Sequence, residues 1–247
     1  MISIRIDVNG AQHVQWPKKP ANILALGQAY VTYEASLPVG QQLAAPSLAV
    51  MQAANTAAQT AQAAADTGEN ARALAAETYR QTMTTAKRQL EIALGRLKGN
   101  HITNLAALQQ WGLDTVSTST GVSVRKPRTD PQWEAFLNAY VSKETSLPAN
   151  EQITDPSLSE MTQLRDDVQA ARAARTSGKN QREFNVLTRT AETQRLLDLL
   201  QTAAVNMVVL RHNGVVSNAL QSWGYVVTAV TPTPAPPVEP PVEEPGS

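Results

Sequence analysis

The chain has 247 residues, with 21 Lys plus Arg against 21 Asp plus Glu, so its formal charge at pH 7 is zero. A balanced charge argues against a nucleic-acid-binding domain, whose affinity comes from a broad basic face. The absence of cysteine excludes disulfides, thiolate metal sites and cysteine nucleophiles. Aromatic residues make up only 4% of the chain, so we expect a core of aliphatic side chains.

The first 20 residues carry a strand pattern. Four apolar residues alternate with polar ones: Ile2, Ile4, Ile6 and Val8. This period of two is typical of a half-buried strand, and Asn9-Gly10 is a strong hairpin-turn signal. We expect residues 11–16 to form the return strand. Because two strands alone are marginally stable in water, this hairpin must pack against its own chain or a neighbouring molecule.

The middle of the chain contains an internal duplication. Residues 29–51 recur as residues 139–161, with 12 of 23 positions identical. Self-similarity of this kind predicts two structural repeats. We place repeat 1 at 21–118 and repeat 2 at 131–230, with a linker at 119–130.

Each repeat is predicted to form an up-and-down four-helix bundle, so the expected fold class is all-α. Apolar residues at helical spacing indicate a first helix at about 21–36 and its counterpart in repeat 2. Pro38 and Pro148 follow the first helix of each repeat, where helices commonly stop. Gly68 and Gly178 are expected to end the second helix, because glycine accepts the left-handed conformation.

A short fourth helix is expected to close each repeat at a Trp-Gly pair. We expect Trp111 and Trp223 to be buried and to hold this helix against its own bundle rather than to bind a ligand. Tyr30 and Tyr140, on the apolar face of the first helix, are predicted core residues by the same reasoning. The strand-like stretches after the Trp-Gly pairs are candidate edges to which the N-terminal strand of another copy could add.

Residues 231–247 hold seven of the chain's 15 prolines. This composition predicts an extended polyproline-II tail that forms no core. Two interpretations stay open: the segment is a docking tail or spacer, or it is a disordered end.

The sequence lacks the motifs of common catalytic sites. No dinucleotide-binding, Walker A, metalloprotease or nucleophile-elbow pattern is present. None of His13, His101 and His212 has the acidic residue three positions earlier that a di-iron helical bundle requires. We therefore expect a non-enzymatic protein with no catalytic residues, no metal, no cofactor and no small-molecule ligand.

The expected location follows from what the sequence lacks. Charges occur within the first eight residues, where a signal peptide would need an apolar core, and no run approaches the 18 apolar residues of a membrane-spanning helix. We expect no integral membrane segment and a cytoplasmic location by default. Extracellular assembly by a route without a cleaved signal remains the alternative.

The arrangement of these motifs resembles a group of largely uncharacterised bacterial proteins. The resemblance rests on the short first helix, the Pro-Ser-Leu that opens a long Ala/Arg-rich segment, and the closing Leu-x-x-Trp-Gly. In that group a helical bundle is often followed by a fibronectin-type-III-like domain. The resemblance implies no catalytic residues and suggests a scaffold or surface-interaction role. This chain departs from the pattern by having two repeats and a proline-rich tail.

These observations predict a structural or interaction protein whose partner is itself. We expect a self-assembling scaffold or filament subunit, joined in part through β-strand contacts of Ile2–Val8. The alternative is an amphipathic-helix protein that coats a lipid surface or storage granule, or acts as a carrier.

Overall fold

The computed structural model describes residues 12–119 and 121–229. The protein belongs to the all-α class, as predicted. Its helices are α1 (Pro20–Ser36), α2 (Leu48–Asn100), α3 (Asp130–Thr145) and α4 (Leu158–Arg211), with short 3-10 segments η1 (Val39–Gln41), η2 (Leu105–Trp111) and η3 (Asn218–Trp223). The strands are β1 (Gln12–Gln15), β2 (Thr115–Thr118), β3 (Gly121–Val124) and β4 (Val226–Ala229).

Two of the predicted features lie outside the described residues. These are the strand residues Ile2, Ile4, Ile6 and Val8, and the proline-rich tail at 231–247. The predicted return strand at 11–16 is represented by β1.

The predicted helix ends at Gly68 and Gly178 are absent, because each glycine lies inside a continuous helix, α2 or α4. One internal glycine costs only about 1 kcal/mol relative to alanine, which is small against the helix propensity of the alanine-rich α2. Both glycines also sit at close helix contacts. A Cβ on Gly68 would lie 2.7 Å from Asn185 Nδ2, and one on Gly178 would lie 3.4 Å from Arg72 Cα.

The compact units of the structure differ from the predicted bundles. Unit 1 combines residues up to 62 with residues from 187 onward, and unit 2 comprises residues 63–186. Each unit therefore contains elements of both repeats, rather than one up-and-down four-helix bundle per repeat at 21–118 or 131–230. The physical reason is the missing turn in α2 and α4: a continuous helix cannot fold back on itself, so its two halves pack in different cores.

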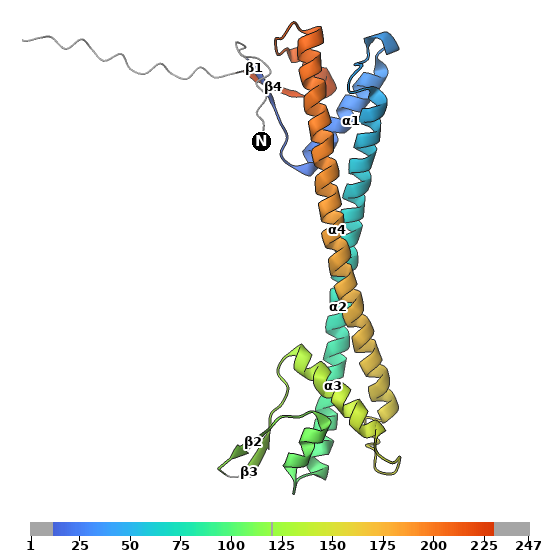
Figure 1. Cartoon of the computed structure of the whole chain (residues 1–247), viewed down its shortest axis with the longest axis vertical. Helices are drawn as coiled ribbons and strands as arrows, with labels where there is room; N and C mark the ends of the chain where they lie inside the picture. Colours follow the sequence, from blue (N-terminus) through green and yellow to red (C-terminus); the bar gives the residue numbers. More distant parts are fainter. Residues whose placement is uncertain (1–11, 120, 230–247) are drawn as a thin grey trace, which may run out of the picture. The chain divides into compact units, whose positions relative to one another are not determined.

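Unit 1 is built from the two ends of the described chain. Its core joins apolar residues of α1 and early α2 to residues of late α4 and η3, among them Tyr30, Met51, Leu200, Met207 and Trp223. Figure 1 shows α1 beside α2 and α4, and β1 next to β4 although they come from opposite ends of the sequence.

Unit 2 is built from the middle of the chain in the same way. Its core joins late α2 and η2 of repeat 1 to α3 and early α4 of repeat 2, among them Leu90, Trp111, Phe136, Tyr140 and Met161. In Figure 1 the β2–β3 hairpin lies at the end of this unit, between η2 and α3 in the chain. Each core therefore combines the first helix of one repeat with the closing Trp-containing segment of the other. The two cores differ in which repeat supplies which element.

The two small sheets have the same register. β1 pairs antiparallel with β4, with Val14 opposite Val227, and β2 pairs antiparallel with β3, with Thr115 opposite Val124. Val124 is 110 positions after Val14, and Val227 is 112 positions after Thr115, which are the offsets of the duplication in those regions. The β1–β4 sheet is thus the counterpart of the β2–β3 hairpin, without a direct connection between its strands.

Candidate functional site

A buried carboxylate joins the repeats in unit 1. Glu34 of α1 is fully buried, and Trp223 Nε1 donates a hydrogen bond of 2.6 Å to its Oε2. The backbone N–H of Leu43 donates to the other oxygen, Oε1. Arg211 adds a cation, with Nη2 3.8 Å from Glu34 Oε1 and the guanidinium 5.4 Å from the Trp223 ring centroid. We call this arrangement the unit 1 clasp.

Unit 2 contains the corresponding clasp. Glu144 of α3 is 1% exposed, and Trp111 Nε1 donates to its Oε1 at 3.2 Å. The backbone N–H of Ile153 donates to Oε2 at 2.9 Å. The ring of Trp111 is contacted by His101, at 4.9 Å between centroids, and by Lys143 Nζ, at 5.4 Å from the centroid.

The clasps offset the cost of burying charge. A buried carboxylate costs several kcal/mol unless hydrogen bonds satisfy it. Each glutamate receives one donor from its own repeat and one indole N–H from the other repeat. Without the other repeat, each buried carboxylate would lose one of its two hydrogen-bond donors. The first helix of each repeat is therefore buried at low cost only when the other repeat is present.

The glycine after each tryptophan completes the contact. Gly112 and Gly224 have φ of 75° and 87°, the left-handed region that favours glycine, and they end η2 and η3. A Cβ on Gly112 would lie 2.5 Å from Ala139 Cβ, and one on Gly224 would lie 2.7 Å from Ala29 Cβ. The Trp-Gly pair therefore needs a residue without a side chain for two reasons, the turn and the close approach to the first helix of the other repeat.

The structure corrects the predicted role of the tryptophans. Trp111 and Trp223 are 5% and 6% exposed. Each contacts the first helix of the other repeat, whereas we expected each to close its own bundle. The local pattern could not reveal this, since a helical face has the same spacing whichever repeat it packs against.

The predicted tyrosines lie in the two cores. Tyr30 and Tyr140 have no exposed surface, and neither hydroxyl has a hydrogen-bond partner within the described residues. Burial, together with the nearby Glu34 and Glu144, raises the pKa of both phenols far above the usual value. Pro38 and Pro148 follow the ends of α1 and α3.

The sequence analysis missed Glu34 and Glu144. They occupy equivalent places in the duplicated segments 29–51 and 139–161, so their recurrence was visible. A glutamate near the end of a helix is usually solvated, and only the tertiary packing shows that these two are buried.

Unit 2 also contains a basic cleft of about 570 Å³, formed by residues of α2, α3 and α4. Tyr79 Oη donates to Glu134 Oε1 at 2.7 Å, and Arg172 Nη1 donates to Glu134 Oε2 at 2.6 Å. The guanidinium of Arg175 lies 4.9 Å from the Tyr79 ring centroid. Burial and the hydrogen bond to Glu134 raise the pKa of Tyr79 to about 12. Both oxygens of the carboxylate are engaged, so this cluster holds α2, α3 and α4 together rather than presenting a base or nucleophile.

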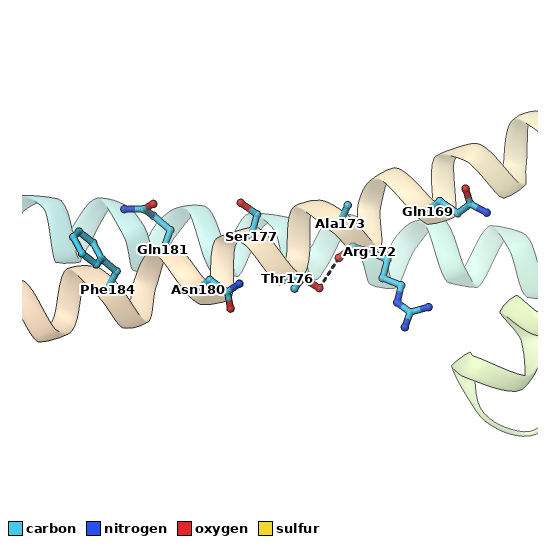
Figure 2. Close-up of a pocket in the computed structure, with 8 residues that line it drawn as sticks. All are labelled: Gln169, Arg172, Ala173, Thr176, Ser177, Asn180, Gln181 and Phe184. Carbon is cyan, nitrogen blue, oxygen red and sulfur yellow. Dashed lines mark hydrogen bonds between the residues drawn. The ribbon is translucent and has the colours of Figure 1, made fainter.

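A shallow depression of about 800 Å³ follows one face of α4. Figure 2 shows that all of its labelled side chains come from this helix and do not converge on a point. Phe184 is 64% exposed at one end. Ligand sites usually bring polar groups together in a concave setting, and the side chains of this face do not converge in that way.

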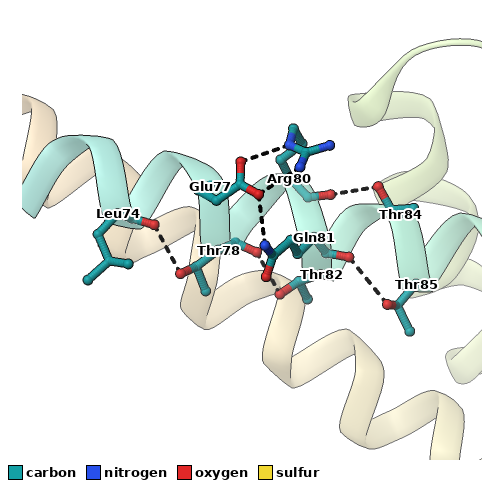
Figure 3. A network of polar contacts seen from close by, with 8 residues as sticks. All are labelled: Leu74, Glu77, Thr78, Arg80, Gln81, Thr82, Thr84 and Thr85. Carbon is teal, nitrogen blue, oxygen red and sulfur yellow. Dashed lines mark hydrogen bonds and ion pairs between the residues drawn. The ribbon is translucent and has the colours of Figure 1, made fainter.

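The polar network on α2 is local. Glu77 forms an ion pair with Arg80 and accepts a hydrogen bond from Gln81, and four threonine hydroxyls donate to carbonyls four residues earlier, as Figure 3 shows. Hydrogen bonds from the Arg80 and Gln81 side chains lower the pKa of Glu77 to about 2. Contacts confined to one helix surface explain this network without a ligand.

The three histidines have separate contacts. His13 Nε2 lies 3.0 Å from Thr228 Oγ1, the His101 ring lies against Trp111 at an interplanar angle of 53°, and His212 Nε2 is buried without a hydrogen-bond partner among the described residues. Within residues 12–119 and 121–229, no group of three or more metal-ligating side chains comes together. In the same ranges, no helix contains an apolar stretch sufficient to cross a bilayer.

A comparison of the chain with protein-family models, with curated proteins and with solved structures finds no match. The resemblance to bacterial helical-bundle proteins therefore stays a prediction.

Proposed function

We propose that this protein is a non-enzymatic structural protein that associates with copies of itself as a scaffold or filament subunit. The observation that carries the proposal is the construction of each unit from two repeats. Both clasps and both Gly–Ala contacts join repeat 1 to repeat 2, and each sheet pairs the strand that follows the Trp-Gly pair of one repeat with the strand that precedes the first helix of the other. Within the described residues, each repeat thus presents a buried surface that is specific for the other repeat.

Association through β-strands would use the free edges of the two small sheets. Within the described residues, β4 pairs with β1 and β2 pairs with β3, so the stretches after both Trp-Gly pairs already have a partner from the same chain. Each sheet has two strands, so each strand has one edge without a strand partner in the described ranges. Strand addition by residues 2–8 of another copy would use one of these edges.

The alternative of a coating or carrier protein has less support. It requires α2 and α4 to present a broad apolar face. Many of their large apolar residues instead fill the two cores, whereas Leu74, Phe184 and Leu187 near the middle of these helices, and Val209 and Leu210 near the end of α4, are 58–70% exposed. Coating would therefore require both cores to open.

Light scattering on the full chain across a range of concentrations, with negative-stain microscopy on the same samples, tests the proposal. We expect a mass above the 26.6 kDa of one chain that rises with concentration, and regular particles or filaments on the grid. A monomer at every concentration would contradict it. Glu77→Gln, on the solvated surface of α2, is the matched control and is expected to associate like the parent.

A further inference from the structure

The contacts that hold the two repeats together are reciprocal. Repeat 1 supplies Glu34 to Trp223 of repeat 2, and repeat 2 supplies Glu144 to Trp111 of repeat 1. Ala29 meets Gly224, and Ala139 meets Gly112, in the same sense. Each repeat therefore contributes two surfaces. Its first helix contacts the Trp-Gly pair of the other repeat, and its own Trp-Gly pair contacts the first helix of the other repeat. This is the pattern of two subunits in an isologous dimer.

The two sheets show that the pairing does not depend on a direct covalent connection. β2 and β3 are separated in the chain only by residues 119–120, whereas β1 and β4 come from opposite ends of the sequence. Their registers are nevertheless equivalent, with Gln12 opposite Ala229 where Val122 is opposite Ser117. The strand pair forms equally when its strands belong to distant segments.

Repeat 1 and repeat 2 are covalently joined only through the connection between β2 and β3. If β2 and β3 of one chain separate, repeat 1 of that chain can receive repeat 2 of another chain through the same clasps, glycine contacts and strand pairs. The contacts between the repeats are then the same in the single chain and in the exchanged pair. The two forms differ only in the link between β2 and β3 and in the effective concentration, which favours pairing within one chain.

We infer that the surface by which repeat 1 receives repeat 2 also receives repeat 2 of a second copy of this chain, so that copies associate by exchanging whole repeats. Two chains that exchange reciprocally form a closed dimer, and successive exchange from chain to chain forms an open polymer. The inference deepens the proposed function and rests on it, because it names the surface through which copies associate.

Two single-cysteine variants test the exchange. The chain has no cysteine, and Gln12 lies directly opposite Ala229 in the β1–β4 pair. Full-length Gln12→Cys and Ala229→Cys are mixed at high concentration, taken briefly through denaturant and back, and then oxidised. We expect a disulfide-linked species of twice the chain mass, because in an exchanged pair Cys at 12 of one chain faces Cys at 229 of the other.

Random collision is measured with exposed positions of the same chain. Val39 and Leu74 are 86% and 70% exposed and both belong to repeat 1. A mixture of Val39→Cys and Leu74→Cys is treated identically and reports collision alone. We expect severalfold more crosslinked species from the Gln12→Cys and Ala229→Cys mixture than from this control.

A lock in the other sheet tests the route. Ser117 and Val122 are the equivalent opposed pair in β2 and β3. In Ser117→Cys/Val122→Cys, oxidation within one chain closes the hairpin and leaves unit 2 as it is. We expect the oxidised form to stay at the mass of one chain after the denaturant cycle and the reduced form to associate like the parent.

The outcomes separate this inference from the proposed function. Crosslinking at the level of the collision control overturns repeat exchange. If the parent chain then still associates by light scattering, the proposed function stands and another surface carries it. If the parent chain is also monomeric at every concentration, both are wrong. Association of the oxidised hairpin lock to the same extent as its reduced form also overturns exchange.

Discussion

Units 1 and 2 hold the same clasp in different surroundings. In both, a buried glutamate of one repeat accepts the indole N–H of the other repeat and a backbone N–H nine residues further along its own. In unit 1 the cation Arg211 contacts both the glutamate and the tryptophan ring, whereas in unit 2 Lys143 and His101 contact the ring. The common geometry shows which contacts the fold requires, and the differences show what the copies have changed.

The basic cleft of unit 2 is another difference between the units. Tyr79, Glu134 and Arg172 form a hydrogen-bonded cluster in unit 2, and the equivalent positions in unit 1 hold Arg189, Leu24 and Gln62. The cluster therefore contributes nothing that the common fold needs.

The largest effect is expected from the tryptophans. Trp223→Ala and Trp111→Ala should each lower the free energy of unfolding by about 3–5 kcal/mol, because each removes a buried ring and leaves one oxygen of a buried carboxylate without its donor. Denaturant unfolding followed by circular dichroism measures the loss. If either variant unfolds at the denaturant concentration of the parent, the clasp does not hold that unit.

The glutamates sharpen the comparison between the clasps. Glu34→Gln should cost about 1–3 kcal/mol, because the amide must turn an N–H toward one of two donors. Glu144→Gln should cost less, since no ion pair of the kind that Arg211 makes with Glu34 is lost. The same unfolding experiment on both variants gives the difference. Equal losses would show that Arg211 adds nothing to the unit 1 clasp.

Alkaline pH tests the cluster that only unit 2 has. The pKa of Tyr79 is about 12 in the folded protein and about 10 in the unfolded chain, so its contribution to stability is complete below pH 10 and is lost as the pH rises toward 12. Tyr79→Phe should therefore lose less stability than the parent between pH 10 and pH 12. Unfolding curves at several pH values measure this. Parallel losses in both proteins would show that Tyr79 does not retain its proton through the cluster.

The smallest effect is expected at the surface network of α2. Glu77→Gln removes an exposed ion pair with Arg80, and such pairs contribute little in water at physiological salt. We expect an unfolding midpoint equal to that of the parent within error, both at pH 7 and at pH 5. A clear drop would mean that this face of α2 is covered by a partner in solution.

Several local features could be predicted from the sequence. The end of the first helix before Pro38 and Pro148 depends on residues next to each other in the chain, as does the return strand near residues 12–15. The buried Glu34 and Glu144 could not be identified in this way. Their burial depends on Trp223 and Trp111, which are 189 and 33 positions away in the chain.

The sequence by itself determined the all-α class, the duplication and the motifs that each repeat carries. Helical periodicity and self-similarity can be read from the order of residues along the chain. Only the tertiary structure decided that α2 and α4 run through without a break and that the Trp-Gly pair of one repeat belongs to the first helix of the other. The physical reason is the duplication itself. Two copies of the same first helix offer each tryptophan nearly the same local surface, so the sequence cannot distinguish them. Because α2 and α4 are long and continuous, each Trp-Gly pair lies at the far end of its helix from the first helix of its own repeat. It packs against the first helix of the other repeat instead.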